Sequence, residues 1–257
     1  GTHVAGIIAS MNDTYKGMAP DANLVAIKSF TSTGAASSET IANGIRWCTD
    51  NRTVFDISII SMSFGDGGSY SSADCPNDTL VDPELQAAHA AGILLVASSG
   101  NSYSTTGVAY PACAQNVIAV GATGRDNDDV ASFSNSGDLL DLLAPGATIT
   151  STVLGNSFGA MSGTSMSAPH VSGAAALLVQ YIKLSEGRTP TPDEIQNRLG
   201  KSGVNVTDSR NDITRPRIDA YSALLPIVKV ESPLNQTYNH TSLQFNISTE
   251  NGNEIYA

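Results

Sequence analysis

The chain has 257 residues, of which 41% are apolar, so it can build a sizeable core and is not a disordered chain. Its formal net charge of −11, with only 13 Lys and Arg, argues against nucleic acid as a partner, because phosphate binding needs clustered basic side chains. No apolar run reaches the ~18 residues of a membrane-spanning helix. We therefore expect no membrane span in this chain, and we expect a monomer.

The first ninety or so residues alternate predicted helices with short apolar segments. The chain opens inside a motif with Gly1 in place of Met, so we expect residues to precede it in the natural protein. Apolar residues at helical spacing predict helices, and short apolar runs predict buried strands. The predicted elements are a helix at 2–9, a strand at 23–30, a helix at 38–51, a strand at 57–63 and a helix at 82–91.

The middle of the chain continues this alternation. Strands are predicted at 93–97, 116–122 and 139–144. The segment Ser165–Tyr181 is apolar nearly all round, which predicts a central, buried helix, and a further helix opens near Thr191. The sequence therefore predicts an α/β fold with a mainly parallel central sheet and helices on both faces. In such sheets, functional residues gather at the carboxyl ends of the strands.

The composition changes near Leu225-Pro226, where a segment rich in Asn, Thr and Ser begins. Within it, residues 242–248 alternate apolar and polar side chains, as a half-buried strand does. We predict one domain at 1–226 and the truncated start of a small β-sandwich at 227–257, which is too short to bury a core alone.

Three cysteines are present, and none forms a CxxC pair, which argues against a zinc site. Cys75 and Cys113 lie in loop-like contexts, and we expect a disulfide between them. Cys48 lies in an apolar helical pattern and is predicted to be a buried free thiol.

A serine stands directly before the predicted buried helix, in Gly163-Thr-Ser-Met-Ser-Ala-Pro-His170. The positive end of a helix dipole favours negative charge that develops at this serine, Ser165. Pro169 is expected in the first turn, where its missing N–H has no cost. Taken alone, Ser165 would be interpreted as a helix N-cap. It does not lie in a G-x-S-x-G elbow, because Ser167 replaces the second Gly.

Two further residues could serve the same chemistry. His3, in Gly1-Thr-His-Val-Ala-Gly6, lies near a helix start and could act as a base. Asn101, in Ser98-Ser-Gly-Asn101, follows a predicted strand, and its amide could donate to an oxyanion. Alone, each has an ordinary interpretation, as a partly buried histidine and a turn residue.

Together, the order His3, Asn101, Ser165 in these motifs closely resembles the subtilisin-like (subtilase) serine peptidases, over roughly residues 1–225. The resemblance implies a secreted or cell-surface endopeptidase that cleaves polypeptides. It implies that Ser165 attacks the scissile carbonyl, that His3 takes and returns the proton, and that Asn101 and the Ser165 N–H stabilise the oxyanion. It implies no cofactor for the chemistry; a structural Ca²⁺ is common in the family, but no ligands are assigned here.

The segment Ile60-Ser-Met-Ser-Phe-Gly65 is similar to the family's substrate-binding strand, which pairs with the peptide as an added strand. None of the residues expected to wall the S1 pocket is charged, which favours cleavage after apolar or uncharged residues. These substrate-binding residues are Ser63, Phe64, Gly65, Ser98, Ser99 and Gly100.

The family's third triad member, an aspartate N-terminal to the histidine, has no position here, because only Gly1 and Thr2 precede His3. We expect the 257-residue chain alone to be inactive or nearly so. Two other functions remain open. A pseudoenzyme would use the protease fold for binding. An α/β hydrolase acting on esters would require Ser before His in chain order.

Overall fold

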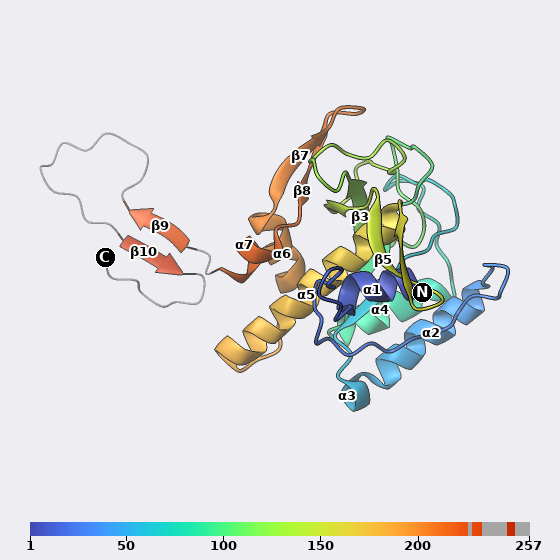
Figure 1. Cartoon of the computed structure of the whole chain (residues 1–257), viewed down its shortest axis with the longest axis horizontal. Coiled ribbons are helices and arrows are strands. Elements are labelled where there is room, and N and C mark those ends of the chain that lie inside the picture. Colours follow the sequence, from blue (N-terminus) through green and yellow to red (C-terminus); the bar gives the residue numbers. More distant parts are fainter. Residues whose placement is uncertain (226–227, 233–245, 250–257) are drawn as a thin grey trace, which may run out of the picture.

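A six-stranded sheet forms the centre of the computed structural model, which describes residues 1–225, 228–232 and 246–249 (Figure 1). The strand order is β1-β2-β3-β4-β8-β7; all neighbours are parallel except β7 and β8. This confirms the predicted α/β fold with a mainly parallel sheet. The strands are β1 (Ile59–Met62), β2 (Leu94–Ser98), β3 (Val117–Thr123), β4 (Leu142–Pro145), β7 (Val204–Asp208) and β8 (Ile213–Arg217).

Helices cover both faces of the sheet, as predicted. In β2, Leu94 and Val96 point into a core cluster with α5 (Thr164–Glu186) and α6 (Pro192–Ser202). The alternate residues of β2 point into a second cluster, with α2 (Ser38–Asp50) and α4 (Val81–Ala90). Burial on both faces explains why these strands are continuous apolar runs. The longest helix, α5, packs against β1, β2, β3 and β4.

Several elements were not predicted from the sequence. The hairpin β5 (Ile149–Val153) and β6 (Ser157–Met161) lies outside the central sheet, and β6 is mostly exposed, so its residues lack an apolar pattern. The turn at Gly155, with φ +83°, joins the two strands. The hairpin β7–β8 and the short helices α3 (Arg52–Phe55) and α7 (Ala220–Leu224) were also missed. The predicted N-terminal helix is confirmed as α1 (Thr2–Ala9).

The strand predicted at 23–30 is wrong, because no strand forms there. Leu24, Val25 and Ile27 are 48%, 41% and 39% exposed. An extended segment becomes a strand only when a neighbour takes its N–H and C=O groups, and no described strand pairs with this one. The apolar pattern of residues 23–30 is therefore present without a strand, and no described strand pairs with this segment.

Near the C-terminus, β9 (Val228–Ser232) and β10 (Asn246–Thr249) form an antiparallel pair. The strand predicted at 242–248 overlaps β10, and its residues 242–245 lie outside the described residues. The β-sandwich at 227–257 and its boundary stay predictions. None of the helices in the described ranges is long and apolar enough to span a membrane.

The cysteine predictions are confirmed. Cys75 and Cys113 form a disulfide, with their Cα atoms 5.8 Å apart. Cys48 is a buried free thiol on α2, and burial raises its pKa.

A half-buried carboxyl group lies just before the first residue of β4, at the amino ends of the parallel strands. Asp141, just before β4, accepts hydrogen bonds from the Ala119 N–H (2.8 Å) and from Gln196 Nε2 (3.2 Å). Burial raises the pKa of Asp141 to about 6, although the Ala119 bond and the charge of Arg215 oppose this shift. Since the unfolded pKa is about 4, the stability that this group contributes is present below pH ~4 and is lost as the pH rises through the folded value.

We predict that Asp141→Asn raises the free energy of unfolding at pH 8 by up to about 2–3 kcal/mol. It keeps an oxygen acceptor for Ala119 and removes the buried charge. Urea unfolding at several pH values would measure the difference, which should vanish near pH 4. The exposed Asp13→Asn is the matched control. A difference that stays the same between pH 4 and pH 8 would contradict the prediction.

Candidate active site

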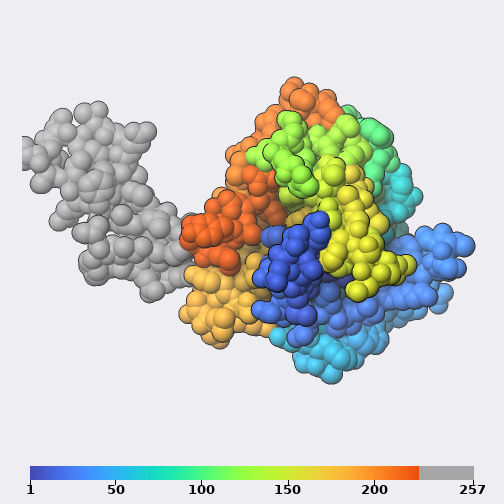
Figure 2. All heavy atoms as spheres, in the orientation of Figure 1, coloured from blue at the N-terminus to red at the C-terminus, as the bar shows by residue number. Residues whose placement is uncertain are grey.

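The three residues predicted to carry chemistry lie on three elements that meet at the carboxyl ends of the strands. Asn101 follows the end of β2, and Ser165 is the second residue of α5. His3 is the second residue of α1, which packs against α5 and β5. Figure 2 shows the N-terminal residues, in blue, against the yellow surface of the hairpin region.

Ser165 is joined to the end of β1 by two reciprocal hydrogen bonds. Its Oγ donates to the carbonyl of Ser63 at 3.2 Å, and the Ser63 Oγ donates to the carbonyl of Ser165 at 2.9 Å. The candidate substrate strand and the candidate nucleophile are therefore held in a fixed relation.

The second of these bonds has its cause in Pro169. Helix α5 begins at Thr164, so Pro169 lies in its second turn. The prediction that Pro169 lies in the first turn is therefore wrong. A helical residue donates its N–H to the carbonyl four positions earlier, and proline has no N–H to give. The Ser165 carbonyl therefore lacks its helical donor and accepts from Ser63 instead. The proline thus leaves this carbonyl free to bind the end of β1.

His3 is only 5% exposed, and its ring does not contact Ser165 through a hydrogen bond in the described part of the chain. Its Nε2 lies 3.0 Å from the carbonyl of Gly159 in β6, so Nε2 carries the proton there. The Nδ1 atom is buried and has no hydrogen-bond partner among the described residues. His3 is therefore close to the site, but the second nitrogen of its ring, Nδ1, has no hydrogen-bond partner among the described residues.

Hairpin β5–β6 holds the backbone around His3. Ser151 Oγ donates to the carbonyl of His3, and Thr152 Oγ1 donates to the carbonyl of Thr2, both at 2.8 Å. Gly6 permits this approach, because a Cβ at Gly6 would collide with the hydroxyls of Ser151 and Thr152. The second glycine of the GTHVAG motif therefore has a packing role.

Asn101 is exposed, and its side chain is oriented by Thr164. The Asn101 Oδ1 accepts from the N–H of Thr164 (2.8 Å) and from its Oγ1 (3.1 Å). Thr164 Oγ1 also accepts from the Gly100 N–H at 3.1 Å. Because Oδ1 accepts both hydrogen bonds from Thr164, Nδ2 is the remaining donor of the Asn101 amide. Sequence reasoning missed Thr164, whose only signal was its place next to Ser165.

The residues predicted to line the S1 pocket lie at the ends of two neighbouring strands. Ser63, Phe64 and Gly65 follow β1, Ser98 is the last residue of β2, and Ser99 and Gly100 follow it. Ser98 Oγ donates to the Phe64 carbonyl at 3.4 Å, so the two segments are in contact. Ser98 and Ser99 are only 3% and 0% exposed, so these two residues present almost no surface to a substrate. Phe64 lies against Phe30, with ring centroids 5.1 Å apart. Gly65 is exposed and Gly100 is half-buried.

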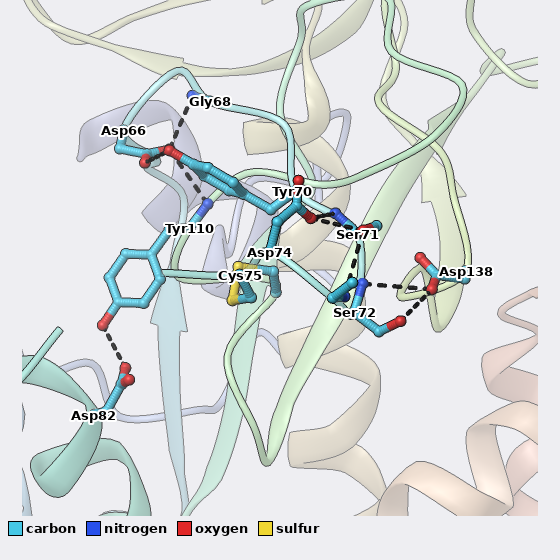
Figure 3. The surroundings of a disulfide bond; sticks show 12 residues. Asp66, Gly68, Tyr70, Ser71, Ser72, Asp74, Cys75, Asp82, Tyr110 and Asp138 are labelled. Carbon is cyan, nitrogen blue, oxygen red and sulfur yellow. Dashed lines mark hydrogen bonds between the residues drawn. A yellow bond between two sulfur atoms is a disulfide. The ribbon is translucent and has the colours of Figure 1, made fainter. Parts of the chain in front are cut away.

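A polar network holds the chain that leaves the candidate substrate strand (Figure 3). Asp66 accepts from the N–H groups of Gly68 (2.9 Å) and Tyr110 (3.3 Å) and from the Tyr70 hydroxyl (2.8 Å). The Tyr110 hydroxyl donates to Asp82 at 2.6 Å. Burial raises the pKa of Tyr110, and this bond raises it further. Together with the disulfide beside it, the network fixes the position of Asp66.

Known proteins are similar to this chain over most of its length. The model of the subtilase family, Peptidase S8, matches residues 1–214. The chain belongs to the subtilase family of serine endopeptidases. Subtilisin DY of Bacillus licheniformis is 39% identical over 214 residues, which cover 81% of this chain and 72% of that protein. Subtilisin E of Bacillus subtilis is 42% identical over 214 residues, covering 81% of this chain but only 51% of that protein.

Solved structures show the same fold. A prenylagaramide maturation protease, PagA, matches with a TM-score of 0.74 and 29% identity, covering 87% of this chain and 81% of that chain. A cold adapted subtilisin-like serine proteinase matches with a TM-score of 0.70 and 30% identity, covering 83% and 72% of the two chains. In the described part of this subtilase, no group of three or more His, Cys, Asp or Glu side chains could hold a metal ion.

We predict that Thr164→Val lowers kcat about tenfold on a peptide substrate and leaves KM nearly unchanged. It removes one hydrogen bond to Asn101 while keeping the shape of a side chain that is fully buried. The measurement is steady-state kinetics of the protein expressed from its whole gene. The control is Thr207→Val, which removes the bond of Thr207 to Thr214 on β7–β8. A Thr164→Val variant that loses only substrate affinity would contradict the role given to Thr164.

Proposed function

We propose that the whole protein hydrolyses internal peptide bonds through an acyl-enzyme, with Ser165 as nucleophile and His3 as general base. The observation that carries this proposal is the orientation of Asn101 by Thr164 directly beside Ser165 at the N-terminus of α5. A preformed amide donor next to a helical serine is the arrangement that tetrahedral acyl-transfer intermediates require.

The reaction follows from these positions. Ser165 Oγ attacks the peptide carbonyl as its proton passes to His3 Nε2. The oxyanion accepts hydrogen bonds from Asn101 Nδ2 and from the Ser165 N–H. His3 then protonates the leaving amine, and water repeats the sequence on the acyl-enzyme. For this step, Nε2 of His3 must give up its hydrogen bond to the Gly159 carbonyl and form one with Ser165 Oγ. A rotation of the ring would bring about this change of partner.

The proposal includes an aspartate outside these 257 residues. The buried Nδ1 of His3 lacks a partner among the described residues, and an imidazolium needs an acceptor on its second nitrogen. A carboxylate here would hold the ring in the tautomer that leaves Nε2 free to accept a proton. Its position in the whole protein would be on the chain that precedes Gly1.

The substrate would lie along Ser63, Phe64 and Gly65 as an added strand. These residues and the segment Ser98–Gly100 carry no charge, which supports cleavage after apolar or uncharged residues. The groups named for the chemistry all belong to the protein, so no cofactor takes part in the proposed reaction. A structural Ca²⁺ and a monomeric state remain predictions without assigned residues.

We also propose that the protein acts outside the cytoplasm. The support is the disulfide between Cys75 and Cys113, because such bonds persist mainly in oxidising compartments.

We predict that a fluorophosphonate probe labels Ser165 in the protein expressed from its whole gene. The adduct, located by peptide mass spectrometry, should disappear in Ser165→Ala and in His3→Ala, since the hydroxyl reacts only with a base beside it. Ser167→Ala, which removes a buried hydroxyl of the same helix, is the control and should keep the adduct.

No adduct on a folded, fully processed protein would contradict a peptidase function and favour a pseudoenzyme. One observation points that way, since His3 contacts Gly159 and not Ser165. An ester-specific α/β hydrolase is contradicted by membership of the subtilase family and by the order of His3 before Ser165.

We further predict that the 257-residue chain alone turns over peptides at least ~10³ times more slowly than the protein from its whole gene. The physical reason is the missing acceptor for His3. The measurement compares kcat/KM of the two proteins at equal folded concentration, checked by circular dichroism. A rate for the 257-residue chain within about tenfold of the whole protein would contradict the external aspartate.

A further inference from the structure

A fully buried residue with an amide side chain, Asn135, lies on the loop between β3 and β4 and contacts both neighbours of Asn101 in the chain. We propose that Asn135 is a positioning residue that holds the loop carrying the oxyanion donor Asn101. This inference rests on the proposed function and adds a determinant of its rate.

The side chain of Asn135 binds the loop directly after Asn101. Its Oδ1 accepts from the backbone N–H of Ser102 at 2.8 Å and from that of Ser104 at 3.2 Å. One oxygen therefore fixes two peptide groups within three residues of Asn101, both on the C-terminal side of Asn101.

The backbone of Asn135 binds the loop directly before Asn101. Its N–H donates to the Gly100 carbonyl at 2.9 Å, and its carbonyl accepts from Ser99 Oγ at 3.0 Å. Gly100 has φ +103° and lies so close to the Asn135 amide that a Cβ there would collide with Nδ2. The loop is thus tied to Asn135 on both sides of Asn101, while Asn101 itself remains exposed.

The loop of Asn135 is held from its other side by Arg210. The guanidinium donates to the carbonyls of Ser132 (2.6 Å) and Ser134 (2.8 Å) and pairs with Asp208 at 2.7 Å. Asn135 is therefore a fixed part of the scaffold, and the exposed loop of Asn101 takes its position from it.

The carbonyl oxygen of the side chain makes both contacts, whereas Nδ2 is buried without a hydrogen-bond partner among the described residues. The two backbone N–H groups converge on one carbonyl oxygen, which can accept both. Alanine would leave both N–H groups without an acceptor in a buried setting, and the loop would shift to find one. A displacement of about 1 Å can cost ~10²-fold in rate. For the oxyanion Asn itself, subtilisin, a relative of this chain, loses ~10²–10³ in kcat.

The test is a double-mutant cycle on the protein expressed from its whole gene. We expect Asn135→Ala to lower kcat by roughly 10- to 100-fold while KM changes less than about twofold. In an Asn101→Ala background the same substitution should lower kcat less than about twofold, because the donor that it positions is already absent. If the alanine variant does not fold, Asn135→Thr takes its place, because threonine fills more of the space but cannot reach both N–H groups. We expect Asn135→Thr to show the same changes in kcat and KM as those given for Asn135→Ala.

A second readout reports the loop without catalysis. Amide hydrogen exchange of the peptide that contains Ser102 and Ser104 should speed up in Asn135→Ala. The control is Asn51→Ala, which removes a hydrogen bond from an Asn side chain to the backbone carbonyl of Trp47 on α2. It should change neither the hydrogen exchange of this peptide nor kcat.

Each contrary result has a separate meaning. Equal losses in kcat in both backgrounds, or unchanged exchange at Ser102 and Ser104, would overturn the inference while an active wild type leaves the proposed function intact. A wild type that hydrolyses no peptide would overturn the proposed function, and this inference with it.

Discussion

The contact between the end of β1 and the start of α5 determines where every other part of the site can lie. Ser63 and Ser165 exchange two hydrogen bonds, and one of them exists because Pro169 leaves the Ser165 carbonyl without a helical donor. The apolar side chains of α5 are buried against four strands, so the N-terminus of this helix cannot move without disturbing the core. The serine is therefore held by the fold as a whole.

The other groups are arranged around this fixed point by short polar contacts. Thr164 orients Asn101 on one side, and hairpin β5–β6 holds the backbone of His3 on the other. These contacts differ in completeness. The Asn101 side chain accepts two hydrogen bonds from Thr164, whereas the His3 ring has a buried nitrogen without a partner in the described chain. The Asn101 side chain is therefore oriented by its neighbours, whereas one nitrogen of the His3 ring has no partner among the described residues.

Most of the fold could be predicted from the sequence because its parallel strands are buried on both faces, and burial is visible as apolar runs. The motifs around His3, Asn101 and Ser165 indicated the subtilase family, which the match of the family model to residues 1–214 confirms, while the roles of the three residues stay predictions. The failures have a physical pattern. Strand β6 is largely exposed, so burial does not require an apolar pattern there, and the segment 23–30 has an apolar pattern but no pairing partner among the described strands. The roles of Thr164 and Pro169 depend on contacts between distant residues, which spacing along the chain does not encode.

We propose that Asn101 and the N-terminus of α5 form a ready oxyanion site beside a reactive Ser165. A crystal structure of the whole protein inhibited by a peptide aldehyde would test it most directly. We predict a covalent bond to Ser165 Oγ and a hemiacetal oxygen about 2.7–3.1 Å from Asn101 Nδ2 and the Ser165 N–H, with His3 Nε2 turned from Gly159 to Ser165. An adduct whose oxygen points into solvent, with Asn101 bound elsewhere, would contradict the claim.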